Sequence, residues 1–176
     1  ARLTETKEHA PKIDGALMDN IVDFMTWTIA PLLWIYATMD LTVWPLIICA
    51  IASAFGFSNI RAKTDDNFFL GFPSYWNIVV FYIFLLDLPN LFASVILIIF
   101  ALVTFLPVKF VYPSRTKYLR LFTLGLAAVF IIQLVALMYF FDDSPPWIIY
   151  SSFIFPFYYF GLSFYVNVKT VETSHN

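Results

Sequence analysis

"LRLFTLGLAAVFIIQLVALMYFF", residues 119–141, is a long apolar run whose one charged side chain, Arg120, lies at its edge. A helix of about 20 residues spans the hydrocarbon core of a bilayer, so the run predicts a transmembrane helix. The other residues have the same character, because the chain of 176 residues is 61% hydrophobic and 20% aromatic. Only 12% of its residues are charged, whereas soluble domains carry about 25%. The composition predicts an all-α integral membrane protein.

Five further apolar runs predict a bundle of about six transmembrane helices. The six runs are residues 15–39, 41–60, 75–88, 91–108, 119–141 and 147–166. The third and fourth are short for a membrane span, and no alternation typical of strands is present. The predicted organisation is a loop over 1–14, a transmembrane domain over 15–166 and a C-terminal tail over 167–176.

The basic residues predict the orientation of the helices. If the regions between runs alternate across the membrane, one side holds every lysine and arginine: Arg2, Lys7, Lys12, Arg61, Lys63, Lys109, Arg115, Lys117, Arg120 and Lys169. Cytoplasmic loops of membrane proteins are enriched in these residues. We therefore expect both chain ends to be cytoplasmic.

Carboxylates open the first apolar run, in "KIDGALMDNIVDFMTW" (residues 12–27). On a helix, Gly15, Asp19 and Asp23 lie on nearly the same face, with about 6 Å of rise between neighbours. Two stacked carboxylates near a membrane need a compensating cation, and oxygen ligands suit Mg²⁺ or Mn²⁺. The alternative is that the acids are favoured by the helix dipole. We prefer that interpretation for Asp14, but Asp23 lies too deep in the run for it.

The spacing "AR…G-x-x-x-D-x-x-x-D" resembles the second half of the signature of the CDP-alcohol phosphotransferase family. Ala1 and Arg2 match the "AR", and Gly15, Asp19 and Asp23 match the rest. The twelve residues between Arg2 and Gly15 are more than is usual in that family. This spacer, "FLGFPSYWNIVVFYIF" (69–84) and "LPVKFVYPSRTKYLRLFTL" (106–124) resemble the bacterial phosphatidylcholine synthases of the family.

This resemblance implies an enzyme that transfers a phosphatidyl group from CDP-diacylglycerol to choline and releases CMP. It implies that Asp19 and Asp23 are metal ligands for Mn²⁺ or Mg²⁺, and that Asp23 is the catalytic base. It also implies that Arg2 and Gly15 are nucleotide-binding residues. The first two aspartates of the family signature would precede Ala1, so we expect this chain to be the C-terminal part of the family's helical bundle and to be inactive alone.

The resemblance also implies the partners of the protein, which are CDP-diacylglycerol, choline and membrane lipids. We expect no nucleic-acid partner, and a homodimer stays open. Two alternatives for the function also stay open. One is a related transferase that uses another alcohol, such as serine or inositol. The other is a transporter in which Asp19 and Asp23 couple ion movement, and CMP release distinguishes it from an enzyme.

Two further sets of residues are candidates for substrate contacts. Quaternary ammonium ions bind to aromatic faces, and "FPSYWN" places Tyr75 and Trp76 at the expected depth of Asp19. The alternative is an interfacial aromatic belt. Arg115 and Arg120, in a basic loop, are candidates for binding the lipid phosphate, against the alternative of topological anchoring.

Overall fold

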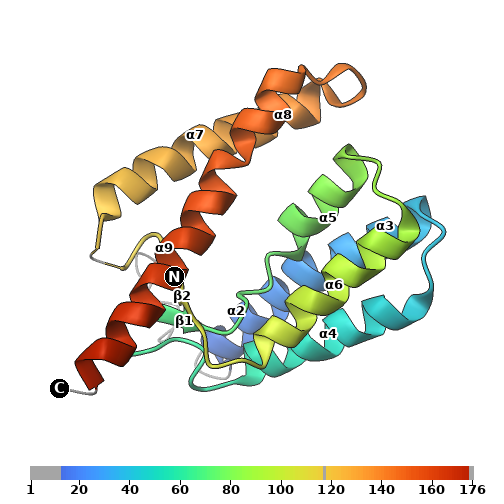
Figure 1. Ribbon diagram of the computed structural model, residues 1–176. Helices are drawn as coiled ribbons and strands as arrows, with labels where there is room; N and C mark the ends of the chain where they lie inside the picture. Colours follow the sequence, from blue (N-terminus) through green and yellow to red (C-terminus); the bar gives the residue numbers. More distant parts are fainter. Residues whose placement is uncertain (1–12, 117, 175–176) are drawn as a thin grey trace. The chain divides into compact units, whose positions relative to one another are not determined.

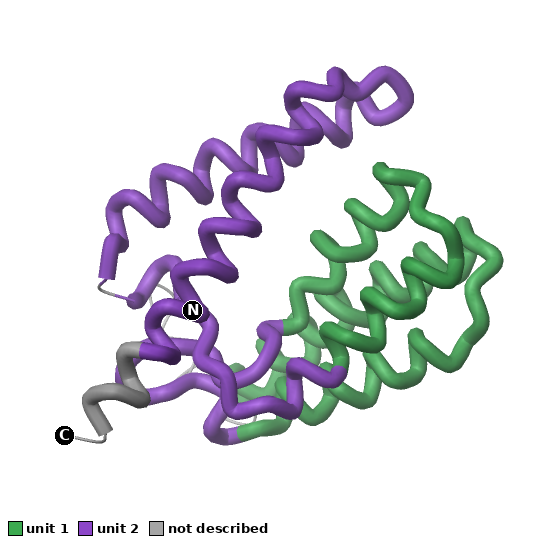
Figure 2. Tube along the Cα trace, in the orientation of Figure 1, with its two compact units in different colours: residues 1–59, 74–101 green, residues 60–73, 102–176 purple. Residues whose placement is uncertain are grey.

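The computed structural model describes residues 13–116 and 118–174, and the chain divides into two compact units (Figure 1, Figure 2). Unit 1 comprises the residues up to 59 together with 74–101. Unit 2 comprises 60–73 together with the residues from 102 onward. Each unit is therefore built from two separate stretches of the chain.

Unit 1 is a bundle of helices that begins with the carboxylate-bearing segment. Its elements are α2 (Gly15–Asp23), the π-helix η1 (Phe24–Ile29), α3 (Ala30–Thr38), α4 (Val43–Ser58), α5 (Trp76–Leu85) and α6 (Asn90–Thr104), whose last turn belongs to unit 2. The helix α6 packs through Ala93, Leu97 and Ala101, which recur every four residues and are fully buried. The Cys49 thiol of α4 donates a hydrogen bond to the Leu97 carbonyl at 3.6 Å. Small side chains at this spacing allow membrane helices to approach closely.

Proline positions explain local features of these helices. Pro31 has no N–H to donate within the helix, and the π-helix η1 lies just before it, where the Ala30 N–H bonds the Met25 carbonyl five residues back. Pro45 lies in the first turn of α4, where backbone N–H groups have no partner in the helix and a proline is tolerated. The bundle therefore accommodates both prolines without breaking a helix.

Unit 2 combines a small sheet with the C-terminal helices. Its elements are β1 (Phe68–Leu70), β2 (Lys109–Val111), α7 (Arg120–Tyr139), the 3₁₀-helix η2 (Phe141–Asp143), α8 (Pro146–Ser152) and α9 (Ile154–Ser174). The strands are antiparallel, with Phe69 opposite Phe110. Pro156 cannot donate to the Ser152 carbonyl four residues earlier, which accounts for the break between α8 and α9.

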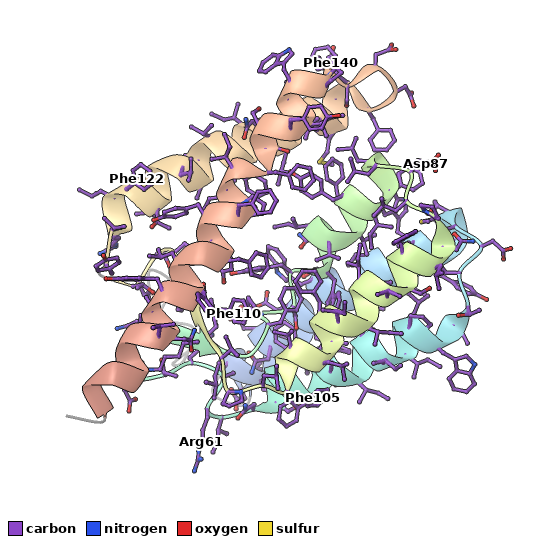
Figure 3. All side chains as sticks on the ribbon, viewed as in Figure 1. Arg61, Asp87, Phe105, Phe110, Phe122 and Phe140 are labelled. Atoms are coloured by element: carbon purple, nitrogen blue, oxygen red, sulfur yellow. The ribbon has the colours of Figure 1, made fainter. Side chains whose placement is uncertain are left out.

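Aromatic and polar contacts hold α7 and α9 side by side (Figure 1). The hydroxyls of Thr123 and Tyr158 are 2.7 Å apart, and the rings of Phe130 and Phe155 stack with centroids 4.9 Å apart. Phe110, labelled in Figure 3, stacks on Tyr159 of α9 at 6.1 Å. These contacts join the helices and the sheet of unit 2 into one core.

The helices confirm the predicted all-α class, and each of the six apolar runs contains a helix. Within the part of the chain that the structure describes, three segments are long and apolar enough to cross a membrane, namely Gly15–Thr38, Arg120–Tyr139 and Pro146–Val168. Three apolar helices are shorter, namely Val43–Ser58, Trp76–Leu85 and Asn90–Thr104. The structure adds the two-stranded sheet, which the sequence pattern did not predict because strands of three residues are too short to alternate visibly.

The sheet supports the grouping of loops on one side of the membrane. The strand β1 comes from the region 61–74 and β2 from the region 109–118, and the two strands pair directly. The side chain of Asn167, near the C-terminal end, binds the backbone of Lys109. Three of the four regions that were placed on the basic side therefore meet in one place.

Candidate functional site

Asp14 caps the helix that carries the candidate site. Its side-chain oxygen accepts hydrogen bonds from the backbone N–H groups of Ala16 and Leu17 at 3.0 and 3.1 Å. A carboxylate in this position satisfies N–H groups that have no partner in the helix. The structural interpretation preferred for Asp14 is thus confirmed, and Asp19 and Asp23 remain as the candidates for chemistry.

The helix α2 begins at Gly15 and ends at Asp23, so the three motif residues lie at successive turns of one regular helix. A neighbouring face of α2 is the one that packs. Asn20 donates to the Phe57 carbonyl at 3.4 Å, and Phe24 contacts the Phe57 ring edge-on with centroids 6.1 Å apart. Asn20 follows Asp19 by one residue, and Phe24 follows Asp23 by one residue, which is a rotation of about 100° around the helix axis. Asp19 is therefore left exposed and Asp23 half-buried.

A π-helix follows Asp23 directly and covers Phe24–Ile29. Such π turns are rare and frequently lie at functional sites. Thr28 in this turn is fully buried, and its Oγ1 has no hydrogen-bond partner among the described residues. A buried hydroxyl without a partner is costly, so the turn is maintained at some expense in stability.

The donor chemistry of Asp19 and Asp23 fits a hard divalent cation, because carboxylate oxygens are the ligands that Mg²⁺ and Mn²⁺ prefer. Within residues 13–116 and 118–174, however, no group of three His, Cys, Asp or Glu side chains is placed to hold a metal ion. Two carboxylates at this spacing could supply only part of a coordination shell. The fit is one of ligand type and of spacing along α2.

Gly15 lies in open surroundings, because a Cβ built on it meets no described atom within 4 Å. Among the described residues, none occupies the space beside this glycine in the first turn of α2. Arg2, the other residue expected to contact the nucleotide, lies outside the described residues.

The two aromatic candidates for choline binding differ sharply in exposure. Trp76 is fully buried, and its Nε1 donates to Ser53 Oγ at 2.5 Å, so no part of its ring is open to a ligand in this structure. Tyr75 is half-buried, and its ring lies 6.1 Å from that of Trp27, tilted by 59°. The structure therefore brings Tyr75 beside the helix of Asp23 and places Trp76 in the core of unit 1.

The arginines proposed for phosphate binding are both exposed. The guanidinium of Arg115 lies 5.5 Å from the ring centroid of Tyr112, and Arg120 is the first residue of α7. Positive charge at a helix N-terminus adds to the positive end of the helix dipole. Both side chains are thus available to an anion, in unit 2.

Lys109 in the same unit is already paired. Its Nζ lies 2.6 Å from the Asp66 carboxylate and 5.6 Å from the centroid of the Phe68 ring. Partial burial raises the pKa of Asp66, but hydrogen bonds from Lys109 and Thr64 and the charge of Lys109 outweigh it, so the pKa lies below its ordinary value. The charge of Lys109 is therefore largely neutralised by Asp66, and Lys109 is a structural residue of the sheet.

Two residues near the site were not singled out from the sequence. Trp27 continues the stripe of Gly15, Asp19 and Asp23 by one more step of four, and that spacing could have identified it. Ser53 lies in an apolar run and contacts residues more than 20 positions away. No local pattern in the sequence marks Ser53.

Comparisons with known proteins identify similar chains. A phosphatidylcholine synthase of Rhizobium meliloti (strain 1021) is 31% identical over 173 residues, which cover 96% of this chain and 71% of that protein. Those of Legionella bozemanae and Legionella pneumophila are 43% and 44% identical over 124 residues, or 68% of this chain. This chain spans 57% and 49% of the length of these two Legionella proteins. No family model matches, and no solved structure matches.

Proposed function

Because the chain belongs to the phosphatidylcholine synthase family, we propose that it catalyses the transfer of a phosphatidyl group from CDP-diacylglycerol to choline, with release of CMP. The observation that carries the proposal is the similarity to the Rhizobium meliloti enzyme over 96% of this chain. The helix α2 supports it, since it places Gly15, Asp19 and Asp23 at successive turns.

In the proposed reaction the hydroxyl oxygen of choline attacks the phosphorus that carries the diacylglycerol group. The bond from that phosphorus to the CMP oxygen breaks, and CMP leaves. Asp23 takes the proton of the choline hydroxyl. Asp23 is half-buried, so part of its carboxylate stays open to the choline hydroxyl.

Asp19 and Asp23 are the residues that would hold a divalent cation, Mn²⁺ or Mg²⁺. A cation bound there supplies positive charge that neutralises the pyrophosphate and favours departure of CMP. Asp19 is exposed, which leaves its carboxylate accessible to the substrate. The nucleotide is proposed to lie beside Gly15, where a Cβ would meet no described atom, and Arg2 is proposed to bind its phosphates. Arg115 and Arg120 are proposed to attract anionic lipid.

We also propose that the protein lies in the bacterial inner membrane and that its active site faces the cytoplasm. The distribution of basic residues supports this orientation. A lipid substrate with a polar head needs a site at the level of the headgroups. The position of Asp19 near the N-terminal end of the apolar segment Gly15–Thr38 suits that depth.

The test is an assay on membranes that contain the protein expressed from its complete gene. CDP-diacylglycerol, Mn²⁺ and isotopically labelled choline are supplied, and labelled phosphatidylcholine and CMP are measured. The expected result is CMP release that depends on choline. CMP release with serine or inositol but none with choline would reject choline as the acceptor. Absence of CMP with every alcohol, for a folded protein, would reject a transferase.

A further inference from the structure

Two aromatic rings from separate stretches of the chain form a corner in unit 1, beside the helical segment that follows Asp23. Trp27 lies in η1, and Tyr75 directly precedes α5. Their ring centroids are 6.1 Å apart and their planes are tilted by 59°. We propose that Trp27 and Tyr75 together hold the trimethylammonium group of choline, an inference that rests on the proposed function.

The chemistry of choline favours such a corner. A quaternary ammonium has no N–H to donate, so it is bound through its positive charge and its methyl groups. Aromatic faces attract such a cation within about 6 Å of the ring centroid, and tryptophan does so best. Because the two centroids are 6.1 Å apart and the planes are inclined, one cation can lie within that distance of both rings.

The corner also lies at a suitable place relative to the proposed base. Trp27 follows Asp23 by four residues, which in α- or π-geometry is close to one turn along the same side of the helix. Choline separates its hydroxyl from its nitrogen by only two carbon atoms. A cation bound at Trp27 therefore keeps the hydroxyl within reach of the turn that carries Asp23.

Buried hydrogen bonds on both sides of Tyr75 fix its position. Ser74 and Trp76 are both buried, and each donates to the same acceptor, Ser53 Oγ of α4, at 3.1 and 2.5 Å. Ser74 has a φ of 56°, a backbone conformation that a residue other than glycine adopts only when its surroundings enforce it. Trp76 is thus a positioning residue for Tyr75, and a site fixed in this way loses little freedom on binding.

The competing interpretation is an aromatic belt at the membrane interface. The chain offers a matched control for it, because Trp34 on α3 contacts the Phe84 ring with a similar tilt of 55° and a centroid distance of 4.8 Å. Trp34 is 40% exposed and Trp27 is 37% exposed. Trp34 lies eleven residues beyond Asp23, or about 16 Å along a helix, too far to share one choline molecule with it.

The experiment measures choline KM in the protein from its complete gene with CDP-diacylglycerol saturating. Trp27→Ala and Tyr75→Ala should each raise choline KM by about 10-fold or more, since cation–π contacts that exclude water contribute at least the free energy that a factor of ten represents. The KM for CDP-diacylglycerol should stay unchanged. Trp34→Ala should leave both values at those of the unmodified protein.

A second readout separates binding of the charge from a loss of structure. The neutral carbon isostere of choline, with a tert-butyl group in place of trimethylammonium, has the same shape but no charge. Removing either ring should reduce the preference for choline over this isostere, and Trp27→Phe, which keeps a weaker π face, should reduce it less than Trp27→Ala. The proposal would be overturned if Trp27→Ala and Tyr75→Ala both left choline KM and the preference for choline over the isostere unchanged. It would also be overturned if Trp34→Ala changed these two quantities as much as Trp27→Ala does. Failure of the unmodified protein to make phosphatidylcholine would instead overturn the proposed function.

Discussion

Asn167 of α9 binds both backbone groups of Lys109 in β2. Its side-chain oxygen accepts from the Lys109 N–H at 2.9 Å, and its amide nitrogen donates to the Lys109 carbonyl at 2.7 Å. One helical turn earlier, Ser163 Oγ accepts from the Val111 N–H at 3.1 Å. The helix α9 therefore supplies the hydrogen bonds that a third strand would give to this edge of the sheet.

Replacing Asn167 with Leu should destabilise the protein, because the N–H and carbonyl of the half-buried Lys109 both lose their partner. An unsatisfied buried group costs about 1–3 kcal/mol, so we expect a fall of about 2 kcal/mol in the free energy of unfolding, measured in detergent. Asn77→Leu is the control, since Asn77 is exposed and its side chain bonds only the adjacent Ile78 N–H among the described contacts. Equal effects of the two variants would contradict the pairing role.

Gly71→Ala should prevent the end of β1 from packing. Gly71 has a φ of 81°, and a Cβ there would lie 2.3 Å from the backbone oxygen of Thr104. Backbone strain and this clash should together cost about 3 kcal/mol or more. Gly125 of α7 is the matched control, because a Cβ there meets no described atom within 4 Å, and Gly125→Ala should raise stability by up to about 1 kcal/mol. Thermal unfolding of both variants measures the contrast.

Two buried threonines should respond in opposite directions to the same substitution. Thr28→Val removes a hydroxyl without a described partner, so stability should rise by about 1 kcal/mol. Thr123→Val removes the partner of the Tyr158 hydroxyl, 2.7 Å away, so stability should fall by about 1 kcal/mol. A loss of stability in Thr28→Val would contradict this prediction and would mean that the Thr28 hydroxyl has a hydrogen-bond partner in the protein in its membrane.

The Asp66–Lys109 pair should make the stability of the sheet depend on pH. The folded pKa of Asp66 lies below its ordinary value of 3.8, so its stabilising contribution is present above pH 3.8 and is lost as the pH falls through the folded value. The unmodified protein should therefore unfold at a higher temperature than Asp66→Asn at neutral pH, and the difference should vanish in acid. Asp65→Asn is the control, because the exposed Asp65 makes no described ion pair. An equal difference at all pH values would contradict this assignment.

The two aspartates of α2 should differ in their kinetic roles. Asp19→Asn should weaken binding of Mn²⁺, so that more Mn²⁺ is needed for activity, and should lower the rate as well, because a metal ligand acts already in the ground state. Asp23→Asn should abolish turnover while nucleotide binding is partly retained, since a base acts mainly in the transition state. CMP release and nucleotide affinity are the two measurements. Normal activity in both variants would reduce the stripe to a structural role.

The helices could be predicted from the sequence because an apolar run and its flanking prolines determine a membrane helix without reference to distant residues. The alignment of Gly15, Asp19 and Asp23 on one helix face could likewise be predicted, since it depends only on their spacing of four residues. The β1–β2 pairing was not predicted, because it joins residues about 40 positions apart. The burial of Trp76 depends on Ser53 in another helix, and such a contact leaves no periodic signal near either residue.

The connection between β1 and β2 has a consequence for biogenesis. The helices α5 and α6 lie between the strands in the chain, so during synthesis β1 emerges well before its partner. If α5 and α6 span the membrane, as the sequence predicts, the strands can pair only after both helices have entered it and returned the chain to its starting side. A hairpin that inserts wrongly would leave both strands with unpaired edges in water, which exposes them to aggregation. Pairing of β1 with β2 therefore requires that α5 and α6 have already been synthesised, which makes the small sheet a late step in the folding of unit 2.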